Sequence, residues 1–313
     1  MSQSARARAI EELPERFNAA SDLIDPNLAA GRGEKVAVID YRGNTTFAEL
    51  AERIDRMAGV FRASGIKREQ RVLLCLLDTV DFPTVFLGAI KAGVVPVPLN
   101  TLLVADDYSW ILENSAAVAV FVSEELSHHW TEIAAANPQV QFISSGDGPW
   151  RKLDDLLVDA EPVTAPADTH RDDVAFWLYT SGSTGRPKGA MHTHASLRLI
   201  ANLFGIGVIG YRESDIILSV AKQFFAYGLG NALAFPYAAG ATVVLHKDRA
   251  TPQAISDLIV RHKVTVLNGV PTFFAGWFAG DAAPTRHEAP ALRIATSAGE
   301  CLPPQLGEAF RHR

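Results

Sequence analysis

The stretch Val174-Ala-Phe-Trp-Leu-Tyr-Thr-Ser-Gly-Ser-Thr-Gly-Arg-Pro-Lys-Gly189 decides how this sequence is interpreted. Its first six residues are apolar or aromatic, which is typical of a buried strand. Three glycines then let backbone N–H groups come close to a ligand, and four Ser/Thr hydroxyls add hydrogen-bond donors. Lys188 supplies a cation, and Pro187 stiffens the backbone before it. A buried strand that ends in such a loop predicts a site for a polyphosphate.

Two better-known phosphate motifs do not fit this loop. The P-loop needs Gly-x4-Gly-Lys-Ser/Thr, whereas Pro187 stands five residues after Gly182. The dinucleotide pattern GxGxxG fails because Gly182 and Gly185 have the wrong spacing. The alternative is a flexible surface linker, which the aromatic strand directly before the loop disfavours.

Short apolar runs alternate with amphipathic stretches on both sides of the loop. This rhythm is typical of β-α units around a largely parallel sheet. It predicts strands at 36–40, 72–77, 94–99, 118–122, 140–144, 174–179, 216–220, 241–245, 264–267 and 293–296. It predicts helices at 46–64, 82–92, 105–114, from 124, from 195, at 228–239, 252–262 and 272–280, and from 303. The expected fold class is therefore α/β, with two lobes of β-sheet flanked by helices.

A linker is predicted at residues 159–173, which contain two prolines and show little periodicity. We therefore expect a first α/β subdomain at residues 1–170 and a second at residues 171–313. The second subdomain would contain the glycine-rich loop.

The composition excludes several classes of protein. With 313 residues, the chain can bury a core without disulfides. A net charge of −6 and the lack of a basic run argue against a nucleic-acid partner. Cys75 and Cys301 are too few for a disulfide framework and lack metal-ligand spacing. No apolar stretch reaches about 18 residues and none near the N-terminus suits a signal peptide, so we expect no membrane partner and a cytoplasmic location.

A second candidate site is Ala221-Lys-Gln-Phe-Phe-Ala-Tyr-Gly-Leu-Gly-Asn231, where aromatic and small residues precede an apolar helix. Phe225, Ala226, Tyr227 and Gly228 can form a flat apolar slot for a planar ring. From composition alone, a buried helix start with ordinary core aromatics is the commoner interpretation.

A third candidate is Thr296-Ser-Ala-Gly-Glu-Cys-Leu-Pro303, with small residues at the carboxyl end of a predicted strand. Ligands of α/β sheets bind at this edge. The alternative is a tight strand-to-helix turn with Pro303 at the first helical position. His192 and His194 stand two residues apart after the loop, a spacing that could bind a metal ion, but no third ligand is visible in the sequence. The preferred interpretation is that His194 or Thr193 caps the following helix.

With these motifs, the sequence resembles the adenylate-forming acyl-CoA synthetases, a family that also includes luciferases and peptide-synthetase adenylation domains. The glycine-rich loop carries the resemblance, which covers essentially the whole chain. Within the family the sequence looks most similar to benzoate-CoA ligases and their hydroxybenzoate relatives. The segments behind this finer likeness are Phe17-Asn-Ala-Ala20, Leu77-Asp-Thr79, 91–103 and 221–231.

The resemblance implies an AMP-forming ligase that uses ATP, Mg²⁺ and CoA to convert an aromatic carboxylate to its CoA thioester. The implied phosphate-binding residues are Thr180, Ser181, Gly182, Ser183, Thr184, Gly185 and Lys188, with Thr184 also beside Mg²⁺. The implied adenine-binding residues are Ser297, Ala298, Gly299 and Glu300. The implied acid-binding residues are Phe225, Ala226, Tyr227 and Gly228.

Two residues depart from the family pattern. Gln223 stands where an apolar residue is expected, which leaves the preferred acid open. Asn268 precedes Gly-Val-Pro where an aromatic residue is common, which would widen or polarise the wall of the acyl or CoA tunnel.

The resemblance also implies parts beyond Arg313: a second Mg²⁺-binding motif, a ribose-binding acid, a hinge, and a small C-terminal domain with the adenylation lysine. We therefore expect the 313-residue chain to show little or no ligase activity. The alternatives are a non-catalytic ATP-binding fragment, an incompletely folded fragment, and an enzyme that loads an acyl group onto a carrier protein. The segment 224–231 disfavours the carrier-protein alternative.

Overall fold

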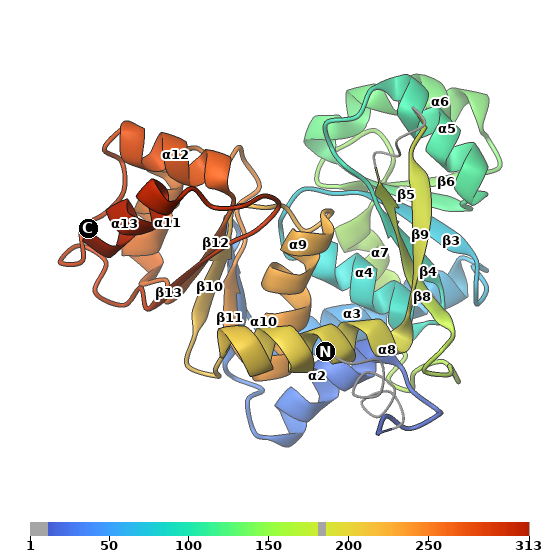
Figure 1. The fold of residues 1–313 in the computed structure, drawn as a ribbon. Helices are drawn as coiled ribbons and strands as arrows, with labels where there is room; N and C mark the ends of the chain where they lie inside the picture. The colour runs from blue at the N-terminus through green and yellow to red at the C-terminus, as the bar shows by residue number, and fades with distance from the viewer. Residues whose placement is uncertain (1–11, 181–185, 313) are drawn as a thin grey trace.

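The computed structural model describes residues 12–180 and 186–312 of the chain. Within these residues, two β-sheets and a β-hairpin are separated and covered by helices (Figure 1). None of the described helices is both long and apolar enough to cross a membrane.

The larger sheet has six strands in the order β13-β12-β10-β11-β1-β2. Its members are β1 (Val36–Asp40), β2 (Gly43–Thr46), β10 (Ile216–Ser219), β11 (Thr242–Val244), β12 (Val266–Gly269) and β13 (Ile294–Ser297). All neighbours pair in parallel except β2, which folds back antiparallel to β1. This sheet therefore combines strands from the start and the end of the chain. The division of the chain near residue 170 stays a prediction.

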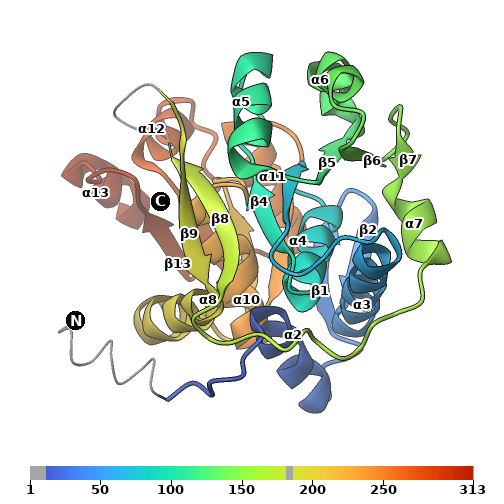
Figure 2. The same ribbon diagram turned by 90° about the vertical axis from the view of Figure 1, so that its right-hand side faces the viewer.

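The smaller sheet has five parallel strands in the order β4-β3-β5-β6-β7. Its members are β3 (Arg71–Cys75), β4 (Val95–Pro98), β5 (Ala119–Ser123), β6 (Gln141–Ser145) and β7 (Arg151–Lys152). The hairpin, β8 (Val174–Thr180) and β9 (Lys188–Thr193), lies beside β4 (Figure 2).

The helices fall into three layers. Those between the two sheets are α2 (Ala19–Ala29), α3 (Phe47–Ala63), α4 (Asp81–Lys91), α8 (His194–Ile200), η2 (Ala201–Ile209), α9 (Ala226–Leu229), η3 (Gly230–Ala234) and α10 (Phe235–Ala239). Those beyond the smaller sheet are α5 (Ala105–Ser115), η1 (Glu124–His129) and α6 (Thr131–Ala136). Helix α7 (Leu153–Asp159) is separate from this layer and packs on α3. Those beyond the larger sheet are α11 (Pro252–His262), α12 (Pro271–Ala279) and α13 (Pro304–His312).

Alternation along each strand explains the layers. In β3, Val72 and Leu74 face the central helices, whereas Leu73 and Cys75 face α5 and α6. Successive side chains of a strand point to opposite faces, so a continuous apolar run requires cover on both sides. The α/β fold predicted from this rhythm is confirmed.

Local signals also set helix ends. Thr46 accepts from the backbone of Glu49, and the Glu49 carboxylate accepts from the backbone of Thr46, which forms the expected capping box of α3. The predicted helix 228–239 is interrupted by a π-helical turn at η3, and the segment after Glu124 begins as a 3₁₀ helix rather than an α-helix. The alternation of apolar runs gave no sign of α2, α7, β2, β7 or β9.

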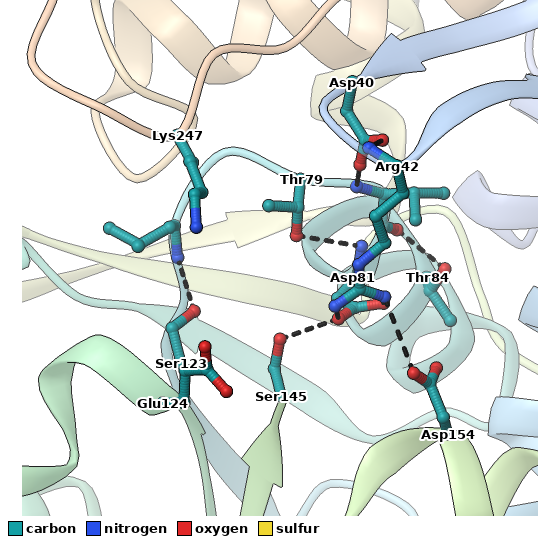
Figure 3. Close-up of polar contacts among 12 residues, drawn as sticks. Asp40, Arg42, Thr79, Asp81, Thr84, Ser123, Glu124, Ser145, Asp154 and Lys247 are labelled. Atoms are coloured by element: carbon teal, nitrogen blue, oxygen red, sulfur yellow. Dashed lines mark hydrogen bonds and ion pairs between the residues drawn. The ribbon is translucent and has the colours of Figure 1, made fainter. Parts of the chain in front are cut away.

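A buried ion cluster ties the β1–β2 turn to the smaller sheet (Figure 3). The Asp81 side chain is 1% exposed and accepts from Arg42 at 2.9 Å, Arg53 at 2.7 Å and Ser145 Oγ at 2.7 Å. Both guanidinium groups also lie within 3.6 Å of the more exposed Asp154. The cluster joins β1–β2, α3, α4, β6 and α7.

Candidate active site

The hairpin β8–β9 carries the glycine-rich loop at its tip. Thr180 and Lys188 are the last residue of β8 and the first of β9, and they are paired across the ladder. Ser181, Gly182, Ser183, Thr184 and Gly185 lie outside the described residues. Lys188 is exposed, as an ε-ammonium must be to meet a phosphate. The loop is thus followed by a strand, whereas a P-loop leads into a helix.

The stem of the hairpin is fixed to α5. Tyr179 donates to Asn114 Oδ1 at 2.6 Å and packs edge-on against Trp110. Burial raises the pKa of Tyr179 to about 12, so this phenol stays protonated and can donate. Gly189 leaves room for the cross-strand aromatic rings, because a Cβ there would lie 3.2 Å from Trp177. These contacts fix the stem of the hairpin against α5.

A cavity of about 630 Å³ lies between the hairpin and the central helices. Its lining is mostly apolar and includes Phe176 and Leu178 from β8, Leu203 and Phe204 from η2, and Tyr227 from α9. An apolar cavity with a few polar groups is the usual form of a small-molecule site. Its volume lies in the range of small-molecule sites, and its aromatic and aliphatic lining suits an apolar group.

The four residues predicted to bind the acid do not occupy equivalent places. Ala226 and Tyr227 line the cavity. Phe225 does not line it and is 46% exposed. Gly228 faces the preceding loop instead, where an added Cβ would lie 1.9 Å from the carbonyl oxygen of Lys222. Gly228 is therefore needed for close backbone packing.

A chain of hydrogen bonds leads from the cavity to the predicted adenine turn. The Tyr227 hydroxyl lies 2.8 Å from Thr296 Oγ1, which in turn donates to Asn268 Oδ1 at 2.7 Å. Asn268 is fully buried and also bonds to the hydroxyl of Tyr211. Asn268 therefore belongs to this buried network, and in the described structure it does not line the cavity.

The predicted adenine turn follows β13 directly. Ser297 is the last residue of β13 and pairs with Gly269 at the carboxyl edge of the sheet. Gly299 has a φ of +95°, which favours glycine, and Glu300 is exposed. The Ser297 hydroxyl is buried without a hydrogen-bond partner among the described residues. A ligand at this edge can supply that partner.

The two histidines after the loop have separate roles. His192 lines the cavity and stacks on Phe176 at 4.6 Å. His194 is buried in α8 and accepts from the backbone N–H of Ala19 at 3.1 Å, while Thr193 caps the helix. Within the described residues, no group of three His, Cys, Asp or Glu side chains could hold a metal ion.

The lining residues from α8 and η2 are the part of the site that the sequence did not predict. Most of them lie in the largely apolar stretch 197–209, which follows the loop. The apolar character of this stretch is the signal in the sequence that could have pointed to them. Helical periodicity cannot distinguish a cavity wall from an ordinary core face.

Comparison with known proteins decides the family. The sequence profile described as "AMP-binding enzyme" matches residues 27–313. The chain belongs to the AMP-binding enzymes. This family assignment confirms the resemblance inferred from the loop.

Individual AMP-binding enzymes give a finer comparison. The chain is 45% identical to the benzoate–CoA ligase of Thauera aromatica over 304 residues, which cover 96% of this chain and 58% of that protein. It is 44% identical to the 4-hydroxybenzoate–CoA/benzoate–CoA ligase of Rhodopseudomonas palustris, over 95% of this chain and 56% of that protein. The chain thus spans under three fifths of the length of these relatives.

Solved AMP-binding enzymes share the fold. The benzoate CoA ligase from Burkholderia xenovorans LB400 superposes with a TM-score of 0.89 at 43% identity, over 95% of this chain and 58% of that one. The anthranilate CoA ligase AuaEII, solved with anthranoyl-AMP, superposes with a TM-score of 0.92 at 31% identity, over 97% and 59%. The described fold is therefore that of the N-terminal part of such ligases.

Proposed function

We propose that this protein is an ATP-dependent aryl-CoA ligase. The observation that carries the proposal is the apolar cavity lined by Ala226 and Tyr227. A hydrogen bond between Tyr227 and Thr296 connects this cavity to the turn 297–300. One subsite suits a planar ring and the other lies at a ligand-binding sheet edge. An aryl-adenylate needs these two subsites side by side.

The reaction has two steps. The aromatic carboxylate attacks the α-phosphorus of ATP, which forms the acyl-adenylate and releases pyrophosphate. The thiol of CoA then attacks the acyl carbon, and AMP leaves as the thioester forms. The first step brings two anions together, so the site must neutralise charge and hold both reactants in line.

The loop residues Thr180–Lys188 would meet this demand at the phosphates. Lys188 offers a cation at the exposed tip of a hairpin whose stem is anchored to α5. Backbone N–H groups and hydroxyls of the loop would add donors. Ser297, Ala298, Gly299 and Glu300 would lie against adenine, where the free hydroxyl of Ser297 has a donor and an acceptor to offer.

Mg²⁺ and CoA complete the proposed set of reactants. Mg²⁺ would offset the negative charge of the ATP phosphates, the chemistry that it usually supplies to bound nucleotides. By the family resemblance, the hydroxyl of Thr184, which lies outside the described residues, would help to hold this ion. The proposed acid is benzoate or a substituted benzoate, in keeping with the names of the relatives.

Calorimetry tests the proposal. Benzoate and hexanoate are titrated into the chain with ATP and Mg²⁺ present. Benzoate is expected to bind at least about tenfold more tightly, because the aromatic lining residues Phe176, Phe204 and Tyr227 can stack on a ring. Ala226→Leu should abolish benzoate binding and leave ATP binding intact. The matched control is Ala135→Leu, at an exposed site on α6. Equal binding of both acids, or an Ala226→Leu chain that binds benzoate normally, would refute the assignment.

A further inference from the structure

Asp78 connects the smaller sheet to the segment that precedes the cavity. It follows β3 and is 3% exposed, although it carries a carboxyl group. Its Oδ1 accepts from the backbone N–H of Gln223 at 3.0 Å. Gln223 follows β10 of the larger sheet, so this bond joins residues 145 positions apart in sequence.

The segment 221–225 transmits this contact to α9. Gln223 is fully buried, and its Nε2 donates to the carbonyl of Ala232 at 3.0 Å. The carbonyl of Lys222 accepts from Phe225 at 3.0 Å and packs against the backbone of Gly228. With so little free space, a displacement of Gln223 must shift the start of α9, where Ala226 and Tyr227 line the cavity.

Lys222 supplies the opposite charge. Its Nζ donates to the carbonyls of His246 and Asp248, in the loop after β11. Burial raises the pKa of Asp78 and lowers the pKa of Lys222, and the opposite charge of each partner offsets part of the other's shift. The segment is thus held by a carboxylate from one sheet and an ammonium anchored to the other.

We propose that Asp78 is a positioning residue for the aromatic-acid site: its carboxylate, together with the charge of Lys222, holds the segment 221–225 so that Ala226 and Tyr227 form the cavity wall. The inference rests on the proposed function, because it takes the cavity to be the acid site.

The protonation state of Asp78 distinguishes positioning from simple support of the fold. Burial raises the pKa of Asp78 to about 6, above its ordinary value of 3.8. Between these values the folded state binds more protons than the unfolded state, so the free energy of unfolding rises as pH falls toward 3.8. The ionised carboxylate therefore destabilises the fold at neutral pH. Its removal should weaken ligand binding without lowering the melting temperature.

Two other titratable groups, His246 and Asp248, interact with Lys222, the charged partner of Asp78. The charge of Lys222, in the loop after β10, acts on Asp78, and the charge of Asp248, in the loop after β11, acts on Lys222. Burial, and then Lys222, lowers the pKa of His246. Because His246 is titratable and its backbone carbonyl binds Lys222, the His246→Gln variant separates its contribution from that of Asp78.

The test measures benzoate affinity and melting temperature on the 313-residue chain at pH 7.5. Asp78→Asn keeps the shape of the side chain but removes its charge. Benzoate is expected to bind this variant about tenfold more weakly, which is the effect of losing one charge-assisted hydrogen bond. The melting temperature of the variant should be unchanged or higher. The control Asp248→Asn removes an exposed carboxylate that also interacts with Lys222, and should change neither quantity. In the unmodified chain and in His246→Gln, affinity should fall as pH drops from 7.5 to 5.5.

Each contrary result has a defined meaning. If the unmodified chain binds benzoate and Asp78→Asn binds it within twofold, the positioning role is wrong and the proposed function stands. A joint loss of affinity and melting temperature, or of cooperative unfolding, would also overturn the positioning role. A benzoate affinity that is flat with pH would do the same. If the unmodified chain binds no benzoate at any pH, the proposed function fails and this inference fails with it.

Discussion

Replacement of Asp81 by Asn is expected to destabilise the chain strongly. The Asp81 side chain is 1% exposed and takes hydrogen bonds from Arg42 and Ser145 (Figure 3). It takes a further hydrogen bond from Arg53. Asn keeps the volume of the side chain but removes the negative charge between two guanidinium groups. Among the described residues, Asp154 remains as a carboxylate 3.5–3.6 Å from them, and its side chain is 55% exposed.

The expected loss follows from the burial of the partners. Breaking a buried ion pair by removing one side costs about 3–5 kcal/mol, because the other charge stays desolvated. The side chains of Arg42 and Arg53 are 27% and 26% exposed, so water relieves part of that cost. We therefore expect a loss of about 3 kcal/mol in the free energy of unfolding, toward the lower end of that range. At about 2–4 °C per kcal/mol for a large domain, the melting temperature should fall by roughly 6–12 °C.

Thermal unfolding followed by circular dichroism measures this loss. Asp154→Asn is the matched control, since it removes an exposed carboxylate from the same two arginines and should cost less than about 1 kcal/mol. An Asp81→Asn chain that loses no more stability than the Asp154→Asn chain would refute the reasoning that burial of the carboxylate makes the cluster strong.

Three further predictions concern single residues. Gly228→Ala should lower the melting temperature by several degrees, because the added Cβ would overlap a backbone carbonyl. The control Gly276→Ala in α12, where an added Cβ meets nothing closer than 4.0 Å, should raise the melting temperature slightly. Equal effects of the two substitutions would contradict the packing argument. Burial lowers the pKa of His194 to about 4, so the unfolded state binds more protons than the folded state below pH 6.5. The free energy of unfolding should therefore fall by up to about 3 kcal/mol between pH 6.5 and 4. Chemical denaturation of His194→Gln should show a flatter dependence on pH, and an identical dependence would be contrary evidence. Burial raises the pKa of Cys75 to about 11, whereas Cys301 is exposed. A thiol reagent should therefore label Cys301 quickly and Cys75 only after unfolding. Rapid labelling of both cysteines in the folded chain would count against the described core.

Local patterns predicted much of the fold. The bounds 36–40 of β1 and the start of α3 at its capping box agree with the structure, because apolar runs and caps act within a few residues. The family resemblance predicted that Ala226 and Tyr227 bind the acid; both line the cavity, and their binding role stays a prediction.

Long-range partners could not be predicted in the same way. Strand β9 has a polar sequence, and it is a strand because β8 pairs with it and because Trp177 covers Gly189. The pairing of β1 with β11 joins Val38 to Val243, and no pattern in either strand specifies that partner. The Asp81 cluster and the bond between Asp78 and Gln223 also depend on residues distant in sequence. Propensity and periodicity carry no information about such contacts.

The central claim is that the apolar cavity and the turn after β13 together bind an aryl-adenylate. A crystal structure of the chain with a non-hydrolysable benzoyl-adenylate analogue tests this claim most directly. The account predicts the ring in the cavity beside Ala226 and Tyr227, and adenine against residues 297–300. A ring bound elsewhere, such as in the charged cavity near Arg42 and Lys247, or an adenine away from the turn, would contradict it.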